Sequence, residues 1–290
     1  MYLGIDGGGT KTRFTLVDEN FKVLCSIDKG TTNFKQVGFE NLAILINQGI
    51  LEIKNKYKID NLKIGIGLSG YGRVKSINDK IDFEISKYLK NYYLTSDIYI
   101  ALVGALNFEK GINLISGTGS VGVLLDENNE LIRCGGFGYQ LGDEGSAYFI
   151  GKELLRRFTN QVDGRLEKTK LYDSVRSYLK IEDDYDIIAK INTREDIASF
   201  SKICFELAEI EEKNALEIFD SAGYYLSEIA NNLAKRVLDN KVKMTTTGSV
   251  FLAKKYLNLE RYLDKKIELV DSKYPPDIGA CILAKKYLTK

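Results

Sequence analysis

The 290-residue chain contains no histidine. Without an imidazole group the chain cannot form Ser-His-Asp or Cys-His nucleophile arrangements, nor a histidine-based zinc site. Any catalytic acid or base must therefore be a carboxylate, lysine, tyrosine or cysteine side chain. A surplus of basic residues is also missing, because 41 Lys and Arg stand against 40 Asp and Glu, for a net charge of +1. Broad, sequence-independent binding to nucleic acid requires such a surplus, so we expect no nucleic-acid partner.

The four cysteines are widely spaced and form no C-x-x-C pair: Cys25, Cys134, Cys204 and Cys281. This spacing predicts buried, reduced thiols and argues against a zinc ribbon or a disulfide framework. Long hydrophobic runs are absent as well, since the longest, Ile98 to Leu106, is far shorter than the ~20 residues that span a bilayer. Met1-Tyr2 leads directly into a strand-like segment without a basic or apolar leader. We therefore expect a cytoplasmic protein with no membrane partner.

The chain is 44% hydrophobic and 28% charged, which together with its length predicts a globular protein of two domains. Its first third alternates between strand-like and helix-like patterns. The expected elements are three antiparallel strands at Tyr2–Asp6, Arg13–Val17 and Lys22–Ile27, a helix from Leu42, a strand at Lys63–Leu68 and a helix at Ile77–Tyr93.

A second cycle of strand, glycine turn and strand begins near Ile112 and repeats the pattern of the amino terminus. Most of the remaining chain is predicted to be helical, and Gly223 lies on a long apolar stripe where it would permit close helix contact. The later elements are strands at Ile112–Ser116, Val121–Leu125 and Leu131–Cys134 with a turn at Asp126–Glu130, strands at Val242–Thr246 and Lys266–Val270, and helices after Gly248 and after Pro275-Pro276.

The first glycine turn, Asp6 to Thr12, lies between two predicted strands. Successive glycines expose several N–H groups to one centre, which suits phosphate oxygens. The segment is neither a P-loop, because Thr10 stands where the glycine before Lys11 is required, nor a dinucleotide fingerprint, because Thr12 stands where the last glycine is required. The Asp6 carboxylate could hold Mg²⁺ while the turn binds the β- and γ-phosphates. The alternative is an ordinary tight hairpin.

Two further glycine turns carry hydroxyl groups. Ser116 to Ser120 lies between strands, as the first turn does, so the two turns could hold one polyphosphate from two sides. Thr246 to Val250 lies at a strand-to-helix junction, where an adenosine group could rest against exposed backbone. The alternative for this third turn is a helix start capped by Ser249.

Three segments give the chain a resemblance to a known family: Leu3 to Thr12, Leu114 to Ser120 and the longer, highly specific Gly135 to Tyr148. On these motifs the chain resembles the BadF/BadG/BcrA/BcrD ATPase family, which includes N-acetylglucosamine kinase and is part of the superfamily of acetate kinase, sugar kinases, heat-shock protein 70 and actin. The resemblance extends over essentially the whole chain.

The resemblance implies an α/β fold of two RNase-H-like domains, as in actin-like ATPases, with an interdomain nucleotide cleft. We expect residues 1–106 to form the first domain, on the sugar and phosphate side, and residues 107–290 the second, on the nucleotide side, with the last helix able to return to the first. The implied reaction transfers the γ-phosphoryl group of ATP to the 6-hydroxyl of an amino sugar, with Mg²⁺ as the second cofactor, in a homodimer. The residues expected to contact ATP are Gly8, Gly9, Thr10, Lys11, Thr12, Gly117, Thr118, Gly119, Ser120, Gly248 and Ser249.

Asp97 is the candidate catalytic base, because it follows a strand-like segment where open α/β sheets bind ligands and it matches the base position of the family. The resemblance assigns sugar contacts to Asn33 and Asp143, with Ser69 and Gly136 as further candidates. Carboxylate and amide groups together can read vicinal hydroxyls. Asp97 and Asp143 each also precede a predicted helix, so the alternative role of both is a helix N-cap.

Some positions depart from the family's N-acetylglucosamine kinase pattern. Phe34-Lys35 stands where aromatic residues follow the Asn, Val121 replaces an Asn, and Phe137 replaces a Trp. The pocket walls near the acetamido group are therefore expected to differ. Lys35 could accept an anionic substituent, such as the lactyl carboxylate of N-acetylmuramic acid, or could simply be a solvated surface lysine.

A second interpretation from the same family is an ATP-driven activator of a 2-hydroxyacyl-CoA dehydratase. That branch uses a cysteine just ahead of the second phosphate loop to hold an iron–sulfur cluster, whereas this chain has Leu114-Ile115-Ser116 there. A sugar-responsive repressor would require an added helix-turn-helix, and the chain begins directly on its first strand. The sequence therefore favours an amino-sugar kinase and leaves open N-acetylglucosamine, glucosamine, N-acetylmuramic acid and N-acetylmannosamine as substrates.

Overall fold

The computed structural model describes residues 1–126 and 130–289. The chain divides into two compact units: unit 1 comprises Met1–Asn113 and Asp271–Lys290, and unit 2 comprises Leu114–Val270. The turn predicted at Asp126–Glu130 has its central residues, 127–129, outside the described ranges. Each unit is described separately below.

Unit 1 is built on a mixed five-stranded sheet with the order β3-β2-β1-β4-β5. Strands β1, β2 and β3 are antiparallel, as the short turns between them require, whereas β1, β4 and β5 are parallel. The strands are β1 (Tyr2–Gly7), β2 (Thr12–Val17), β3 (Val23–Lys29), β4 (Lys63–Leu68) and β5 (Tyr92–Ser96). The three antiparallel strands and the Lys63–Leu68 strand agree with the sequence prediction.

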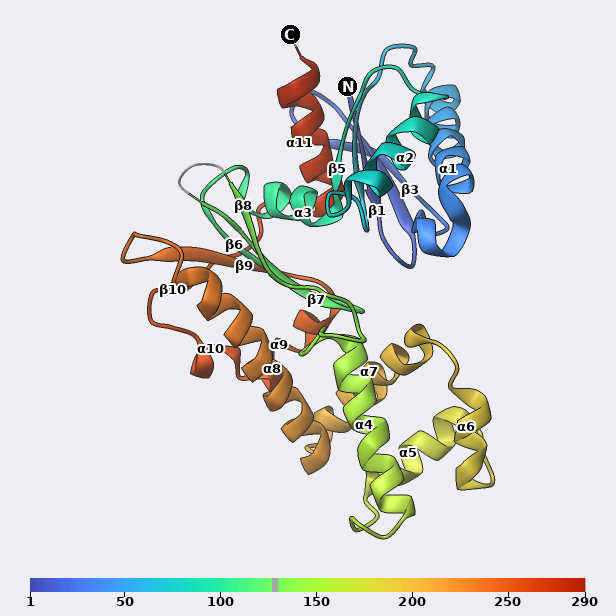
Figure 1. The fold of residues 1–290 in the computed structure, drawn as a ribbon, viewed down its shortest axis with the longest axis vertical. Helices are drawn as coiled ribbons and strands as arrows, with labels where there is room; N and C mark the ends of the chain where they lie inside the picture. The colour runs from blue at the N-terminus through green and yellow to red at the C-terminus, as the bar shows by residue number, and fades with distance from the viewer. Residues whose placement is uncertain (127–129, 290) are drawn as a thin grey trace. The chain divides into compact units, whose positions relative to one another are not determined.

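Helices cover both faces of this sheet (Figure 1). On one face α1 and α2 pack against the sheet around a core that includes Phe14, Ile46 and Ile66. On the other face α3 and α11 pack around Ile100, Ile278 and Leu283, so the final helix belongs to unit 1. The helices are α1 (Phe34–Tyr57), α2 (Lys75–Ser86), α3 (Asp97–Leu106) and α11 (Pro276–Leu288).

The helix predicted at Ile77–Tyr93 is wrong at its carboxyl end. The chain leaves α2 at Ser86 and enters strand β5 at Tyr92. Leu89, Tyr92 and Leu94 all pack on the same core, so apolar spacing there fits a helix and a strand equally well. The first helix also begins at Phe34, earlier than Leu42, and contains a non-helical kink at Gly38.

Unit 2 contains a second five-stranded sheet with the order β10-β9-β6-β7-β8. Strands β7 and β8 are antiparallel, and β9 and β10 are parallel. The strands are β6 (Gly111–Ser116), β7 (Ser120–Leu125), β8 (Leu131–Gly135), β9 (Val242–Thr247) and β10 (Ile267–Leu269). The repeated strand, glycine turn and strand predicted near Ile112 is therefore present.

The long helix α8 packs on β7 and β8 of this sheet, and α4 packs against α7 (Figure 1). The helical elements of unit 2 are α4 (Ala147–Val162), α5 (Lys170–Leu179), η1 (Asp184–Asp186), α6 (Ile187–Lys190), α7 (Arg194–Glu209), α8 (Lys213–Ala234), η2 (Ser249–Ala253), α9 (Lys254–Leu257) and α10 (Leu259–Tyr262). The close contact predicted at Gly223 is confirmed, because a Cβ atom there would lie 1.7 Å from the Leu257 carbonyl oxygen.

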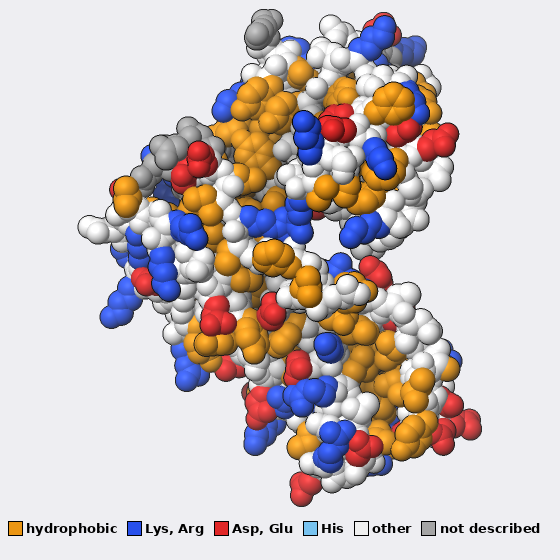
Figure 2. Space-filling view, viewed as in Figure 1, with side chains coloured by type: hydrophobic (Ala, Val, Ile, Leu, Met, Phe, Trp, Pro, Cys, Tyr) orange, Lys and Arg blue, Asp and Glu red, His pale blue; other side chains and the backbone are white. Residues whose placement is uncertain are grey.

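The surface charges agree with the sequence predictions, whereas the burial of the cysteines agrees with them only in part. Basic and acidic side chains are intermixed on the face shown in Figure 2, as near-equal numbers of each sign predict. Cys204 and Cys281 are buried, but Cys25 and Cys134 are partly exposed because they lie on edge strands of the two sheets, which corrects the prediction of four buried thiols. Within residues 1–126 and 130–289, every helix is too short or too polar to cross a membrane.

Candidate functional site

Three candidate residues of unit 1 meet at one edge of its sheet. Strand β1 is parallel to β4, with Asp6 opposite Gly67, and β4 is parallel to β5, with Leu68 opposite Ser96. Parallel strands end on the same edge, so Asp6, Ser69 and Asp97 emerge there together. In open α/β sheets this carboxyl edge is where ligands bind.

The Asp6 carboxyl group lies in a half-buried position at the end of β1. Burial raises its pKa to about 7, and the negative charges of Asp97 and Asp277 act in the same direction, whereas Arg13 and Lys11 oppose them. A carboxyl group held in this way gains a favourable partner when a cation approaches it.

Asp97 is the first residue of α3, and the cap of that helix is Ser96, whose hydroxyl accepts from the Tyr99 amide. The capping alternative considered for Asp97 is therefore wrong. Burial raises the pKa of the Asp97 carboxyl to about 6, although a hydrogen bond from the Ile98 amide and the positive charge of Arg73 hold it lower than burial alone would. A carboxyl group with this pKa can accept a proton near neutral pH.

The first glycine turn is closed by a hydrogen bond from the Gly8 amide to the Lys11 carbonyl at 3.0 Å. Two side chains of the following segment hold it from outside: the Thr31 hydroxyl donates to the Gly8 carbonyl, and the Gln36 amide donates to the Gly9 carbonyl. Thr10 is exposed at the tip. The turn is thus fixed by side chains that leave its tip open.

Two residues of this turn have partners within the fold. The Lys11 ammonium bonds to Asp28 at 2.9 Å, and Arg13 bonds to the same carboxylate. The Thr12 hydroxyl is buried and donates to the Thr32 hydroxyl at 3.0 Å. Thr12 is 0% exposed, so neither its side chain nor its backbone is open to a ligand, which argues against the ATP contact expected of it. Lys11 would have to exchange Asp28 for a phosphate.

Asn33 and Ser69 lie beside the turn. Asn33 caps α1 by accepting from the Lys35 amide, and its Nδ2 atom lies 3.9 Å from the position that a Cβ atom would take on Gly9. The Ser69 amide donates to the Gly7 carbonyl at 2.8 Å, while its hydroxyl oxygen is buried and has no hydrogen-bond partner among the residues that the structure describes. A buried hydroxyl of this kind suits a ligand hydroxyl, because an unpaired polar group is costly.

The acidic residues of this edge fit a hydrated magnesium ion. In the described part of the chain no group of three or more acidic or cysteine side chains could enclose a metal ion. Magnesium bound with nucleotides, however, takes one or two carboxylates and completes its shell with water and phosphate oxygens. Asp6, whose pKa the charge of Asp97 helps to raise, lies at this edge and supplies one such carboxylate.

In unit 2 the second glycine turn is fastened to the Gly135–Tyr148 segment. The Ser116 hydroxyl donates to the Gly145 carbonyl at 2.9 Å, and the Ser120 hydroxyl donates to the Glu144 carbonyl at 2.6 Å. The Ala147 amide returns a hydrogen bond to the Gly117 carbonyl. Two motifs that the sequence analysis treated separately therefore form one structural unit.

Asp143 lies between these two segments and is 4% exposed. Its backbone is left-handed, with φ of +66°, which costs a non-glycine residue about 1–2 kcal/mol. It does not cap α4, as its position before the helix suggested, because Ser146 does so. Its carboxylate accepts instead from the Ser120 amide at 3.3 Å and from Arg194 at 2.7 Å.

Sequence reasoning missed Arg194. It lies 51 positions after Asp143, at the start of α7, so only tertiary structure brings the two together. The sole local signal is the capping box of Thr193 and Asp196, which marks the helix start and thereby fixes where the side chain of Arg194 begins.

Gly136 has φ of +70° and packs against Arg133, which donates to the Gly136 carbonyl at 2.7 Å. A Cβ atom on Gly136 would lie 2.0 Å from the Arg133 Nη2 atom. This glycine is therefore required by the local packing, and its carbonyl already has a donor.

The third glycine turn packs directly on the second. A Cβ atom on Gly248 would lie 2.2 Å from the Ser116 carbonyl oxygen. Gly248 itself, with φ of +114°, is the N-cap of η2, so the prediction that Ser249 caps a helix there is wrong. Next to this turn is a pocket of about 330 Å³ with a mainly apolar lining, to which Ser249, Val250 and Phe205 contribute. Its size suits one planar ring system.

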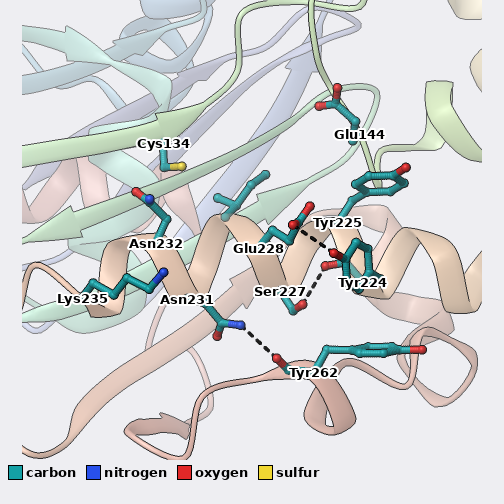
Figure 3. A pocket seen from close by; sticks show the side chains of 11 residues that line it. Cys134, Glu144, Tyr224, Tyr225, Ser227, Glu228, Asn231, Asn232, Lys235 and Tyr262 are labelled. Atoms are coloured by element: carbon teal, nitrogen blue, oxygen red, sulfur yellow. Dashed lines mark hydrogen bonds between the residues drawn. The ribbon is translucent and has the colours of Figure 1, made fainter.

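A larger hollow of about 710 Å³ lies along α8 (Figure 3). Many of its polar groups bond to one another: the Tyr224 hydroxyl donates to Glu228, and Asn231 donates to the Tyr262 carbonyl. None of the candidate site residues named above lines it, and its lining residues that the structure describes are mostly on the surface of one helix. The candidate residues are therefore the first glycine turn with its sheet edge in unit 1, and the second and third glycine turns in unit 2.

The chain is similar over nearly its whole length to known amino-sugar kinases. An N-acetylmuramic acid/N-acetylglucosamine kinase of Clostridium acetobutylicum is 29% identical over 300 residues, covering 98% of this chain and 97% of the relative. An N-acetyl-D-glucosamine kinase of Dictyostelium discoideum is also 29% identical, with 98% and 97% covered.

Solved structures show the same fold. A protein from Chromobacterium violaceum superimposes with a TM-score of 0.81 at 22% identity, with 98% of each chain covered. A ROK family glucokinase from Streptomyces griseus, solved with glucose and AMPPNP, has a TM-score of 0.64 at 16% identity, with 98% of this chain and 99% of that chain covered. The model of the BadF/BadG/BcrA/BcrD ATPase family matches residues 3–284, and the chain therefore belongs to that family.

Proposed function

We propose that the protein transfers the γ-phosphoryl group of ATP to the 6-hydroxyl of an amino sugar, with N-acetylglucosamine as the first candidate. The family membership and the names of the two relatives support this class of reaction. A glucosamine kinase of Vibrio cholerae, 25% identical over 75% of this chain, extends the range of amino sugars among the relatives.

The observation that carries the proposal is the position of Asp97 beside Asp6 and the first glycine turn. Phosphoryl transfer needs a carboxylate that takes the proton of the attacking hydroxyl, and it needs that group next to the bound phosphates. Asp97, with a pKa near 6, is deprotonated at neutral pH and basic enough to accept a proton late in the reaction. We assign it as the catalytic base.

Each unit has glycine turns that suit a part of ATP. The amides of Gly8, Gly9 and Thr10 and those of residues 117–120 would bind phosphate oxygens, and the adenine ring would occupy the 330 Å³ pocket beside Ser249. Asp6 would hold Mg²⁺ through water or directly. When bound, this ion neutralises charge on the transferring phosphate.

The sugar would meet Asn33, Ser69 and Asp143. A carboxylate accepts from sugar hydroxyls, the Asn33 amide donates to them, and the unpaired Ser69 hydroxyl gains a partner. Lys35 is exposed two residues from Asn33, so it is the proposed partner of an anionic substituent such as the lactyl carboxylate that N-acetylmuramic acid carries on its 3-oxygen.

The experiment is a coupled assay of ADP release with N-acetylglucosamine, N-acetylmuramic acid, glucosamine, N-acetylmannosamine and glucose. We expect turnover with at least one amino sugar at least 10-fold above that with glucose, and a 6-phosphate as the product. ADP release that no sugar stimulates would contradict the proposal. Iron bound to anaerobically purified protein would point instead to the dehydratase activators.

A further inference from the structure

Arg194 occupies a position that the proposed sugar-kinase function does not yet use. It is the first residue of α7, and its Nη2 atom donates to the Asp143 Oδ2 atom at 2.7 Å. The arginine side chain is 26% exposed and that of Asp143 is 4% exposed. A charge-assisted hydrogen bond between groups so little exposed is stronger than a surface ion pair.

The same guanidinium group touches the second glycine turn. A Cβ atom on Gly119 would lie 2.6 Å from the Arg194 Nη2 atom and 2.8 Å from the Asp143 Oδ2 atom. The ion pair therefore lies directly against Gly119, and a side chain at that position would displace it. Charge and close packing both hold the Asp143 carboxylate against the turn.

Arg194 also contacts the exposed part of the Gly135–Tyr148 segment. Its guanidinium carbon lies 5.4 Å from the centre of the Tyr139 ring, within the range of a cation–π contact. Its Nε atom is buried and has no hydrogen-bond partner in the described part of the chain. One cation thus joins Tyr139 and Asp143 of the Gly135–Tyr148 segment to Gly119 of the second glycine turn.

The backbone of the second turn does not depend on this arginine. The Ser120 hydroxyl bonds to the Glu144 carbonyl, and the Ala147 amide bonds to the Gly117 carbonyl, without Arg194. Loss of the arginine should therefore weaken the hold on the Asp143 carboxylate, which keeps its hydrogen bond from the Ser120 amide, while the turn itself stays in place. Loss of Arg194 should therefore affect sugar binding through Asp143 and leave nucleotide binding by the turn unchanged.

We propose that Arg194 is a positioning residue that holds the Asp143 carboxylate in the orientation in which it meets the sugar hydroxyls. The proposal rests on the proposed sugar-kinase function, because Asp143 is a sugar contact only there. The left-handed backbone at Asp143 sets the direction in which its side chain leaves the chain, and the hydrogen bond from Arg194 fixes the carboxylate there.

The test compares Arg194→Ala and Arg194→Lys with the wild-type protein. We expect Arg194→Ala to raise the KM for the sugar about 10- to 100-fold, as loss of a charge-assisted hydrogen bond predicts, while kcat and the KM for ATP change less than about 3-fold. Arg194→Lys keeps the positive charge but not the planar guanidinium group, so its sugar KM should lie between those of the wild type and Arg194→Ala. Arg156→Ala is the matched control, because Arg156 lies exposed on α4 and pairs with Glu153.

A double-mutant cycle with Asp143→Asn tests whether the two residues act as a unit. We expect the double variant to be no worse than Asp143→Asn alone. Additive losses, or a sugar KM that Arg194→Ala leaves unchanged, would overturn the proposal. If Arg194→Ala does not fold, the sugar KM of Arg194→Lys decides, since a wild-type value in that variant would likewise overturn it.

Hydrogen exchange provides a readout that does not require kinase activity. In Arg194→Ala, amides of residues 136–146 should exchange at least 10-fold faster than in the wild type, while those of β9 stay unchanged. Should the wild-type protein phosphorylate no sugar, the proposed function fails by itself. Faster exchange confined to residues 136–146 would then still support Arg194 as the residue that holds Asp143, and unchanged exchange would refute it.

Discussion

The carboxyl groups of Asp6 and Asp97 interact across the carboxyl edge of the unit 1 sheet, and the charge of Asp97 helps to raise the pKa of Asp6 to about 7. Asp97, whose own pKa is about 6, ionises first and Asp6 follows. Two acidic groups whose pKa values lie apart can serve different purposes. In the proposed mechanism Asp97 is the catalytic base and Asp6 holds the metal ion.

The pH dependence of turnover follows from Asp97. The base acts only when deprotonated, so kcat/KM should be level above about pH 7 and fall about 10-fold per pH unit below pH 6. Initial rates measured with saturating Mg²⁺ between pH 5 and 8.5 test this expectation. A rate that stays constant down to pH 5 would exclude Asp97 as the titrating base.

Asp6 should destabilise the ligand-free protein at neutral pH. Its folded-state pKa of about 7 exceeds the ordinary value of 3.8, so the folded state holds a proton that the unfolded chain releases, and stability falls as pH rises from about 4 to about 7. Asp6→Asn should therefore raise the free energy of unfolding by about 1–2 kcal/mol at pH 8 and leave it unchanged at pH 4. Urea unfolding without Mg²⁺ or nucleotide measures both values.

Asp28→Asn is a control variant whose stability should change in the opposite direction from that of Asp6→Asn. Lys11 and Arg13 hold the pKa of the Asp28 carboxyl well below its usual range, so this charge favours the folded state above about pH 4. The variant should be slightly less stable than the wild type at pH 8. A gain in stability in both variants would show that the burial of Asp6 is not the cause.

A bulky side chain at the third glycine turn should block the pocket proposed to bind the adenine ring. Ser249 is exposed at the mouth of the 330 Å³ pocket, and Ser249→Trp should raise the KM for ATP at least 10-fold while the sugar KM stays within about 3-fold. Ser177→Trp, on the exposed surface of α5, is the matched control. An equal KM for ATP in both variants would mean that the adenine ring binds elsewhere.

Lys35 should affect kcat/KM only for anionic sugars. Lys35→Met removes a positive charge near Asn33 and should lower kcat/KM for N-acetylmuramic acid about 3- to 10-fold relative to that for N-acetylglucosamine, as expected for a partly solvated ion pair. The two sugars are compared in one assay with the same enzyme preparation. A loss that is equal for both sugars would mean that Lys35 does not contact the substituent.

Local patterns sufficed for the elements that carry the unit 1 site. Short strands joined by tight turns determine the antiparallel β1–β3 sheet, and the position of Asp97 after a strand places it at the carboxyl edge. The boundary of α2 could not be predicted, because Leu89 and Tyr92 are apolar at spacings that suit either a helix or a strand.

The role of Asp143 could not be read from its neighbours. An acidic residue ahead of an amphipathic helix is typical of an N-cap, but Ser146 caps α4 and the Asp143 carboxylate accepts from Arg194 instead. That contact joins positions 51 residues apart. Contacts of this kind depend on how whole helices pack, which no window of sequence contains.

The most direct test of the central claim is ADP release by Asp97→Asn in the presence of the sugar that the wild-type protein uses best. We predict that kcat falls about 100-fold or more while the affinity for ATP, measured separately by calorimetry, stays within about 2-fold. Turnover equal to that of the wild type would contradict the assignment of Asp97 as the base, and with it the mechanism proposed here.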